Sequence, residues 1–241
     1  MQSQAQDKFS QYYEKYIGLQ ETNIHQLLSV SRNPSNEQQH KALVSKVLYL
    51  YKEYYTMKWA GAHEDVLGFY SPTWLSPLEI AHLWITGWKP SITFKLITSL
   101  RQARISGSSL VNLTDEQVKR LEKLRLKISE EEEKVEREME RHQVSIADKK
   151  MLQLARLSTG QMKEHKEIAE ELKRLVDVAM NNLLVGLEKM MKAADCVRLK
   201  AIKEVLDLLT PLQSVDFMVA SLMLQIQLRN WGKRRHSRTM I

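Results

Sequence analysis

Apolar residues recur at helical spacing along almost the whole chain, and the alternation typical of β-strands is nearly absent. In the first predicted helix, Phe9, Tyr13 and Ile17 share one face. A second helix follows a polar break at residues 31–38 and extends over about residues 40–60. The pattern predicts an all-α fold, a single multi-helix bundle with long antiparallel helices and a projecting helical hairpin.

Four helix starts are predicted from capping boxes, in which two side chains three residues apart each satisfy a free backbone donor of the other. A proline at the first helical position strengthens two of these starts. The pairs are Ser35 with Gln38, Ser76 with Glu79, Thr114 with Gln117, and Thr210 with Gln213.

Residues 68–91 hold three of the five tryptophans and three of the five prolines. The second capping box predicts a short helix here, with Trp84 and Trp88 on one apolar stripe, ended by Gly87 and Pro90. This arrangement favours a structural joint between helices over a ligand site.

A long, highly charged helix is predicted over residues 115–143. Leu121, Ile128 and Val135 keep a seven-residue period, but glutamates interrupt the partner seam, which favours a hairpin arm over a sustained coiled coil. The acidic run at residues 130–133 is expected to be a solvated face rather than a cation site.

Further along the chain, a helix is predicted from about residue 161 to 209, with an interruption near residues 192–198. A last helix is expected to end with Gly232 as its C-terminal cap. We therefore expect one helical domain, residues 8–232, followed by a basic tail, residues 233–241.

The formal net charge is +7. Five positive charges fall in the last thirteen residues, at Arg229, Lys233, Arg234, Arg235 and Arg238. Without them the balance falls to +2, so the body of the protein does not resemble a phosphate-tracking surface.

The basic tail has two candidate functions besides solubility. Lys233, Arg234 and Arg235 are candidates for a nuclear-import signal. Arg234 and Ser237 also have the Arg-x-x-Ser spacing that basophilic kinases favour, so phosphorylation of Ser237 could cancel about two of the positive charges.

Motifs that carry chemistry are absent from the sequence. There is no phosphate-binding loop, dinucleotide fingerprint, HExxH or G-x-S-x-G, so no enzyme is predicted. No two histidines are three or four residues apart, which excludes a helical metal clamp. His82 is the one haem candidate, with a surface role as the alternative, and Cys196 is expected to be a buried, reduced thiol.

The chain also lacks the pattern of a membrane protein. Its first residues are polar, and the longest strongly apolar run, residues 217–228, is too short to span a bilayer. We expect an intracellular protein that does not insert into membranes.

The order of residues along three blocks is specific. Residues 54–91 combine a tyrosine-rich helix with an acidic "ED-V" step, "F-SPTW-S-LE" and "LWI-GW-PS". Residues 9–28 and 208–232 supply an opening and a closing block, and together the blocks resemble the plant Delay of Germination domain, which also forms the C-terminal half of TGA-type bZIP transcription factors. The residues that carry the resemblance are Trp59, Glu64, Asp65, Ser71, Pro72, Trp74, Trp84, Gly87, Trp88, Pro90 and Trp231.

The resemblance implies a plant regulatory protein in abscisic-acid-linked control of dormancy, germination or salt response. The expected location is the nucleus, with the cytoplasm as an additional one. It implies action by binding regulatory proteins, such as type 2C phosphatases or bZIP-type factors. A homodimer is one candidate assembly, and the sequence leaves the oligomeric state open. The alternatives are a haem- or lipid-binding sensor built on the same domain, and a pollen-aperture factor of the same family.

Three departures from the family pattern limit these expectations. No basic region and zipper precede Phe9, so the chain is not expected to read DNA sequence by itself. A long C-terminal extension, where haem-ligating histidines are suspected in dormancy members, does not follow Trp231. An acidic-aromatic phosphatase-docking motif is not evident in residues 1–20.

Overall fold

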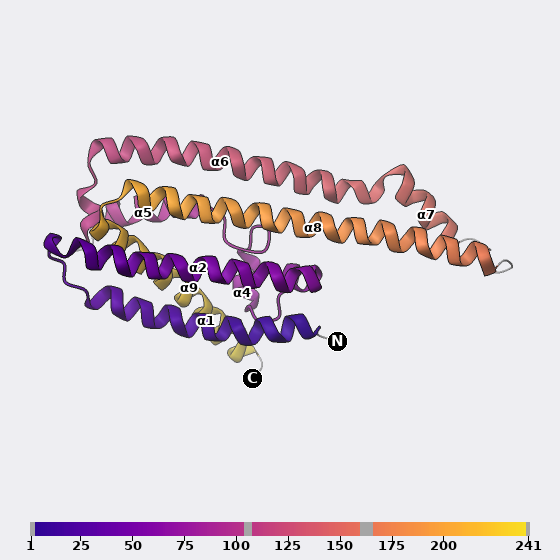
Figure 1. Ribbon diagram of the computed structural model, residues 1–241, viewed down its shortest axis with the longest axis horizontal. Coiled ribbons are helices and arrows are strands. Elements are labelled where there is room, and N and C mark those ends of the chain that lie inside the picture. The colour runs from indigo at the N-terminus through magenta and orange to yellow at the C-terminus, as the bar shows by residue number, and fades with distance from the viewer. Residues whose placement is uncertain (1–2, 104–107, 160–165, 240–241) are drawn as a thin grey trace.

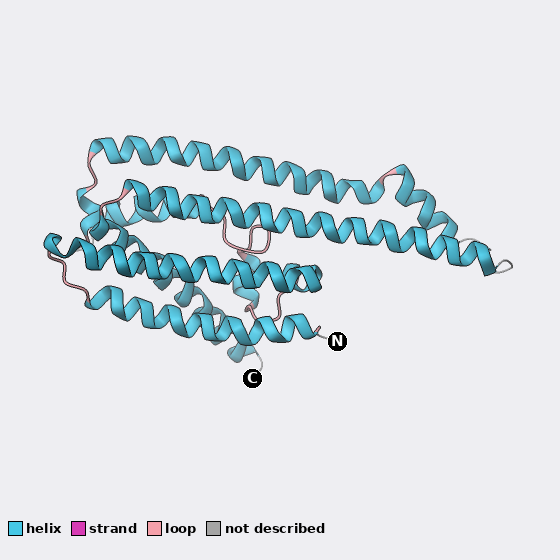
Figure 2. Ribbon diagram, in the orientation of Figure 1, coloured by secondary structure: helices cyan, strands magenta, loops and turns pink. Residues whose placement is uncertain are grey.

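The computed structural model describes residues 3–103, 108–159 and 166–239. Within these residues the regular elements are helices, which confirms the predicted all-α fold (Figure 2). The elements are α1 (Gln4–Ser29), η1 (Pro34–Asn36), α2 (Glu37–Glu64), α3 (Val66–Tyr70), α4 (Pro77–Ala81), α5 (Ile92–Ala103), η2 (Ser109–Asn112), α6 (Asp115–Val144), η3 (Ser145–Ala147), α7 (Lys149–Thr159), α8 (Lys166–Leu208) and α9 (Pro211–Thr239).

The long helices form the predicted bundle. In the order α1, α2, α8 and α6 they lie side by side, and each runs antiparallel to its neighbour (Figure 1). Helix α9 packs against α1 and α2, and α4 and α5 pack against α9. The end of α6, all of α7 and the start of α8 extend beyond the other helices, so the projecting hairpin is confirmed (Figure 1).

Three of the four predicted capping boxes are present. They begin α4, α6 and α9, where Ser76, Thr114 and Thr210 each accept a hydrogen bond from the backbone N–H three residues on. The box at Ser35 was predicted wrongly. Asn33 caps the short η1 helix instead, and the N-cap of α2, Asn36, makes no side-chain hydrogen bond.

The interior has a mainly aliphatic cluster and an aromatic cluster. The aliphatic cluster includes Ile128 and Leu222, both 0% exposed, and it lies among α2, α5, α6, α8 and α9. The aromatic cluster centres on Phe9, whose ring lies 4.8 Å from Phe69 and 4.9 Å from Trp74. The first half of residues 68–91 therefore contributes to the core.

Three helix boundaries differ from the predictions. Helix α4 ends at Ala81, so Trp84 and Trp88 do not share a helix face. Helix α8 continues through residues 192–198 without a break. Helix α9 passes through Gly232 and reaches Thr239, because this glycine serves close packing rather than a cap: an added Cβ would lie 2.0 Å from Ser76 Oγ.

Cys196 was predicted to be buried, but it faces solvent on α8. The core face of α8 is occupied there by its neighbours Asp195 and Val197. Among the described helices, none combines the length and the hydropathy that a bilayer crossing requires.

Candidate functional site

The second half of residues 68–91 forms a loop with a tight turn at its centre. The backbone N–H of Trp84 donates to Gly87 O at 2.6 Å, and the N–H of Gly87 donates to Trp84 O at 3.2 Å. Between them, Ile85 and Thr86 have φ angles of 42° and 61°. Positive φ at both central residues defines a type I′ turn, which β-branched side chains disfavour, so other groups must hold it.

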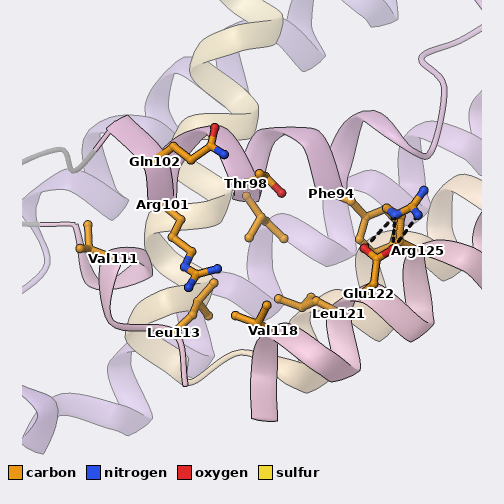
Figure 3. A pocket seen from close by; sticks show the side chains of 11 residues that line it. Phe94, Thr98, Arg101, Gln102, Val111, Leu113, Val118, Leu121, Glu122 and Arg125 are labelled. Atoms are coloured by element: carbon orange, nitrogen blue, oxygen red, sulfur yellow. Dashed lines mark hydrogen bonds and ion pairs between the residues drawn. The ribbon is translucent and has the colours of Figure 1, made fainter. Parts of the chain in front are cut away.

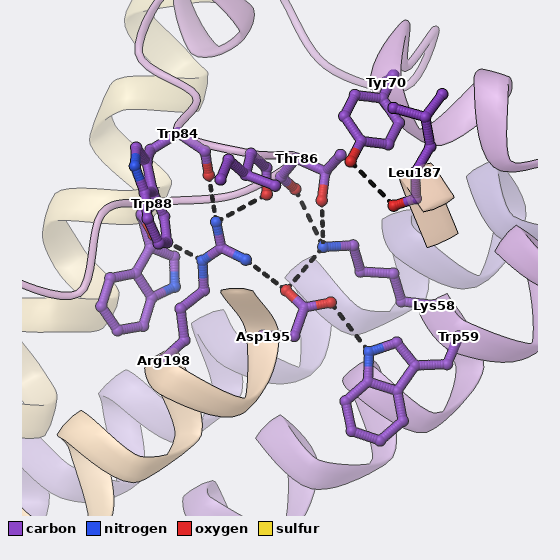
Figure 4. A network of polar contacts seen from close by, with 10 residues as sticks. Lys58, Trp59, Tyr70, Trp84, Thr86, Trp88, Leu187, Asp195 and Arg198 are labelled. Carbon is purple, nitrogen blue, oxygen red and sulfur yellow. Dashed lines mark hydrogen bonds and ion pairs between the residues drawn. The ribbon is translucent and has the colours of Figure 1, made fainter. Parts of the chain in front are cut away.

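Arg198 of α8 holds this turn through backbone carbonyls (Figure 4). Its guanidinium donates to Trp84 O, to Ile85 O at 2.9 Å and to Trp88 O at 2.6 Å. The guanidinium also lies over the Trp84 ring, 5.2 Å from its centroid. The planar fork of arginine suits this multiple contact, which a lysine could not reproduce.

Lys58 of α2 holds the same turn from another side. Its ammonium donates to Thr86 O at 3.1 Å and to Thr86 Oγ1 at 2.9 Å. Together, the two cations engage four loop carbonyls, those of residues 84, 85, 86 and 88.

Asp195 joins the two cations. Its Oδ1 accepts from Lys58 at 2.9 Å and from Arg198 at 2.5 Å, while its Oδ2 accepts from the indole N–H of Trp59 at 3.0 Å (Figure 4). Lys58, Asp195 and Arg198 are henceforth called the ionic cluster. Burying any one of these charges alone would cost much free energy. The three are tolerated in the core because the carboxylate and the two cations neutralise and hydrogen-bond one another.

The ionic cluster is closed to solvent. Asp195 and Arg198 are 0% exposed and Lys58 is 2% exposed. Two cations face one carboxylate, and burial lowers the pKa of Lys58 to about 8, although Asp195 opposes this shift. The dipoles of the loop carbonyls stabilise the remaining positive charge, so the cluster and the loop depend on each other.

A second buried arginine holds the first half of residues 68–91. Arg229 of α9 is 2% exposed, donates to Trp74 O at 3.0 Å, and pairs with Glu14 and Glu79. Glu79 is also the capping-box partner of Ser76. Arg229 therefore belongs to the core rather than to the basic tail with which the sequence grouped it.

Helix α6 contributes two glutamates to the loop. Glu132, 3% exposed, accepts from the backbone N–H of Ser91 at 2.5 Å, at the start of α5. Glu136 accepts from the indole of Trp84 at 2.7 Å and from Lys89 at 2.8 Å. The acidic run at residues 130–133 was predicted to be a solvated face, and this is wrong for one member. Glu132 points inward and satisfies a free N–H at the N-terminus of α5.

The structure brings together several predicted signature residues. Trp59, Trp84, Gly87 and Trp88 lie around the ionic cluster, and Pro72, Trp74 and Pro90 are buried nearby in the chain. Asp65 caps α3 by accepting from Gly68 N at 3.1 Å. Outside this arrangement, exposed positions are held by Glu64, Ser71 and Trp231.

The tail candidates continue helix α9. Lys233, Arg234 and Arg235 are exposed there, and Lys233 pairs with Glu14 at 3.6 Å. The side chain of Ser237 lies outside the described part of the chain.

The ionic cluster was not predicted from the sequence, although the sequence contains a signal for it. Lys58 lies on the same helix face as Tyr51 and Tyr55, both buried. Asp195 and Arg198, three residues apart, interrupt an otherwise apolar stripe of α8. A charged residue on a core-facing stripe indicates a buried partner, because an unpaired charge would be too costly there.

A cavity of about 760 Å³ lies between α5, α6 and the segment around η2 (Figure 3). Its apolar wall includes Phe94, Ile97 and Leu121. Arg101 and Arg125 supply positive charge, and Arg125 is paired with Glu122 at 2.6 Å. The cavity has the size of sites that hold small apolar ligands.

The haem candidate His82 is exposed at the end of α4, and its Nδ1 lies 2.8 Å from Leu78 O. It does not line the cavity described above, so its position does not fit a haem enclosed in the helical core. In the described part of the chain, no three His, Cys, Asp or Glu side chains are grouped to hold a metal ion.

The fold and this site define a class of protein, an all-α scaffold in which a buried ionic cluster fixes a tryptophan-rich loop. The chain belongs to the seed dormancy control family. The model of that family matches residues 21–99.

Curated relatives extend the match over nearly the whole chain. Protein DOG1-like 4 of Arabidopsis thaliana is 46% identical over 237 residues, which cover 98% of this chain and 97% of that protein. Protein ZW2 of the same plant is 32% identical, covering 80% of this chain and 81% of its own. Protein RESPONSE TO ABA AND SALT 1, also of Arabidopsis thaliana, is 27% identical over 82% of this chain and 81% of its own.

Transcription factors of other plants match more weakly. Transcription factor TGAL1 of Oryza sativa subsp. japonica is 24% identical over 88% of this chain but only 42% of its own length. The resemblance to the TGA-type factors thus concerns part of those longer proteins.

Proposed function

We propose that this protein is a non-enzymatic plant regulator in abscisic-acid-linked control of seed germination, dormancy or salt response. The observation that carries the proposal is the near full-length match to Protein DOG1-like 4, together with a second relative named for its response to ABA and salt. The family model is itself described as seed dormancy control.

The geometry of the ionic cluster supports binding rather than catalysis. Its charged groups are buried, mutually paired and turned toward the backbone of the loop. The cavity beside it, near Tyr55 and Trp88, has a volume of only about 40 Å³, room for about one water molecule. The cluster therefore acts as a fixed support for surfaces that contact other proteins.

The partners that we propose are type 2C phosphatases or bZIP-type factors, with the protein acting in the nucleus. The likeness to Transcription factor TGAL1 and the exposed Lys233, Arg234 and Arg235 support this location. A fluorescent fusion with these three residues changed to alanine should lose nuclear accumulation relative to the unchanged fusion. Equal accumulation would remove the tail from the import route.

The experiment that tests the regulatory role is germination of a loss-of-function line on abscisic acid. We expect altered sensitivity, restored by the wild-type protein, and affinity purification from those seeds should return a phosphatase or a bZIP-type factor. Unchanged sensitivity to abscisic acid, salt and after-ripening would contradict the proposal.

The cavity beside Arg101 favours a second candidate function, a sensor for an acyl chain or another apolar carboxylate. Arg101 forms no ion pair within the described residues and is positioned to meet a carboxylate. Native mass spectrometry of the purified protein should then show a bound lipid that Arg101→Gln reduces. Protein without extractable lipid, and without a mass shift on added oleate, would exclude this candidate.

A further inference from the structure

Two hollows flank the last turns of α8. One lies between α6 and α8 with a volume of about 380 Å³, and the other lies between α2 and α8 with about 420 Å³. Glu204 and Asp207 line both, and the three helices lie side by side (Figure 1). The hollows thus form one continuous surface across α6, α8 and α2.

This surface concentrates the positive charge of the bundle. Its six cations, which together with the two hollows are called the basic surface, are Lys52, Arg120, Lys123, Lys127, Lys200 and Lys203. Against two carboxylates they give a formal charge of +4. The chain carries +7, of which four charges lie at residues 233–238, so the remainder of the protein is −1.

Most of these cations are not neutralised within the protein. Lys127 pairs with Glu204 at 3.1 Å, and Lys200 pairs with Glu131 at 2.5 Å. The other four, Lys52, Arg120, Lys123 and Lys203, are exposed and form no ion pair among the described residues. Their charge is therefore available to a partner.

The floor between the cations is apolar. Leu124 and Leu208 lie in the α6–α8 hollow, and Leu48 and Leu199 lie in the α2–α8 hollow. The cations follow helical spacing along each wall, so the charged rows run parallel to the helix axes. An apolar floor between basic rows is complementary to a helix with an apolar stripe between acidic rows.

We propose that the basic surface binds an acidic amphipathic helix of a regulatory partner. The apolar stripe of that helix lies over Leu124 and Leu208, and its carboxylates face Arg120, Lys123 and Lys203. The proposal rests on the proposed function in that the protein acts by contact with other proteins. Nucleic acid is a poorer match, because phosphates would leave the leucines of the apolar floor without a contact.

A defined peptide tests the proposal without knowledge of the natural partner. The probe is a fluorescein-labelled helical peptide of about 18 residues, with leucines at i, i+3, i+4 and i+7 and glutamates on both flanks. Fluorescence anisotropy with the full chain should show saturable binding. The double variant Arg120→Glu/Lys203→Glu should weaken binding about tenfold or more, because it places like charges opposite the acidic rows.

The matched control is Lys150→Glu/Lys173→Glu, which makes the same change of charge at exposed positions of α7 and α8 on the projecting hairpin. It should change the affinity less than about twofold. A peptide of the same composition with its leucines scattered should bind about tenfold more weakly. Unfolding midpoints of both double variants should match the wild type, which separates lost binding from lost fold.

Three outcomes would overturn the proposal. Equal binding of the scattered peptide would indicate charge attraction alone. Equal weakening by the control variant would indicate that no particular surface is used. Stronger competition by duplex DNA or by phosphatidylserine vesicles than by unlabelled peptide would assign the basic surface to nucleic acid or membrane. None of these outcomes would alter a germination phenotype, so failure here and failure of the proposed function are distinguishable.

Discussion

The guanidinium of Arg198 occupies the space in which residue 87 would carry a side chain. A Cβ added to Gly87 would lie 2.7 Å from the central carbon of that guanidinium and 2.8 Å from its Nε. The glycine of the "LWITGW" stretch is therefore required because Arg198, a buried cation more than one hundred residues later in the sequence, approaches it closely. The requirement is one of space, since the positive φ angles of this turn belong to Ile85 and Thr86.

Gly87→Ala should lower the free energy of unfolding by about 1–3 kcal/mol, because either the arginine or the loop must move. Gly18→Ala is the matched control, since Gly18 lies in α1 with no atom within 4 Å of an added Cβ. The control should stabilise by about 0.5–1 kcal/mol through helix propensity. Urea unfolding followed by circular dichroism measures both, and equal effects would contradict the spatial argument.

Asp195→Asn should cost about 3–5 kcal/mol, since it leaves Lys58 and Arg198 buried without a counter-charge. The near-ultraviolet circular dichroism of Trp84 and Trp88 should change as the loop loosens. Asp177→Asn, at an exposed position of the same helix, should be within about 0.5 kcal/mol of the wild type. A wild-type near-ultraviolet spectrum in Asp195→Asn would show that the loop does not depend on the ionic cluster.

Stability should depend on pH in a way that Lys58 determines. Its pKa in the folded state is about 8, below the ordinary value of 10.5. Between these values Lys58 is protonated to a greater extent in the unfolded chain than in the folded one, so its contribution to the free energy of unfolding should rise with pH from about 8 to about 10. Above that range the trend should reverse, because burial raises the pKa of Tyr51 to about 12 and the folded state holds a proton that the unfolded state loses.

The measurement is a series of urea midpoints between pH 7 and pH 11, with Lys58→Met as the comparison. The variant should lose the rise between pH 8 and pH 10 but keep the decline at higher pH. A rise of the same size in Lys58→Met would assign the effect to another group.

Glu132→Ala should destabilise the protein by about 1–3 kcal/mol, because the N–H of Ser91 loses its acceptor in a partly buried site. Glu130→Ala, two residues away on the exposed face of α6, should change stability by less than about 0.5 kcal/mol. Equal effects of the two substitutions, measured by thermal or urea unfolding, would mean that the acidic run acts as a uniform surface.

The parts of the fold that depend on local sequence could be predicted. Capping boxes at Ser76, Thr114 and Thr210 place helix starts correctly, because the two side chains and the backbone they satisfy lie within one turn. The heptad spacing in α6 and the glutamates that interrupt it indicate the hairpin arm for the same reason.

The parts that depend on distant partners could not be predicted. Trp84 and Trp88 have helical spacing, yet Arg198 binds their carbonyls and Lys58 binds that of Thr86, so tertiary contacts outweigh the local pattern. The local sequence makes Gly232 look like a helix cap, but the close approach of Ser76, which is distant in the sequence, is what requires a glycine there. Similarly, the basic end of α9 does not reveal that Arg229 is buried while Lys233 is exposed.

The turn at Ile85 and Thr86 has a consequence for how the molecule is assembled. Its backbone conformation is unfavourable in isolation. Lys58 precedes the turn in the chain, but the other two members of the ionic cluster that holds it, Asp195 and Arg198, are synthesised more than one hundred residues later. During synthesis, Trp84 and Trp88 therefore leave the ribosome before Asp195 and Arg198 exist, and their loop can reach its final conformation only once α8 has been made. A nascent chain interrupted before α8 would therefore leave Trp84 and Trp88 without the contacts that Arg198 supplies in the folded protein.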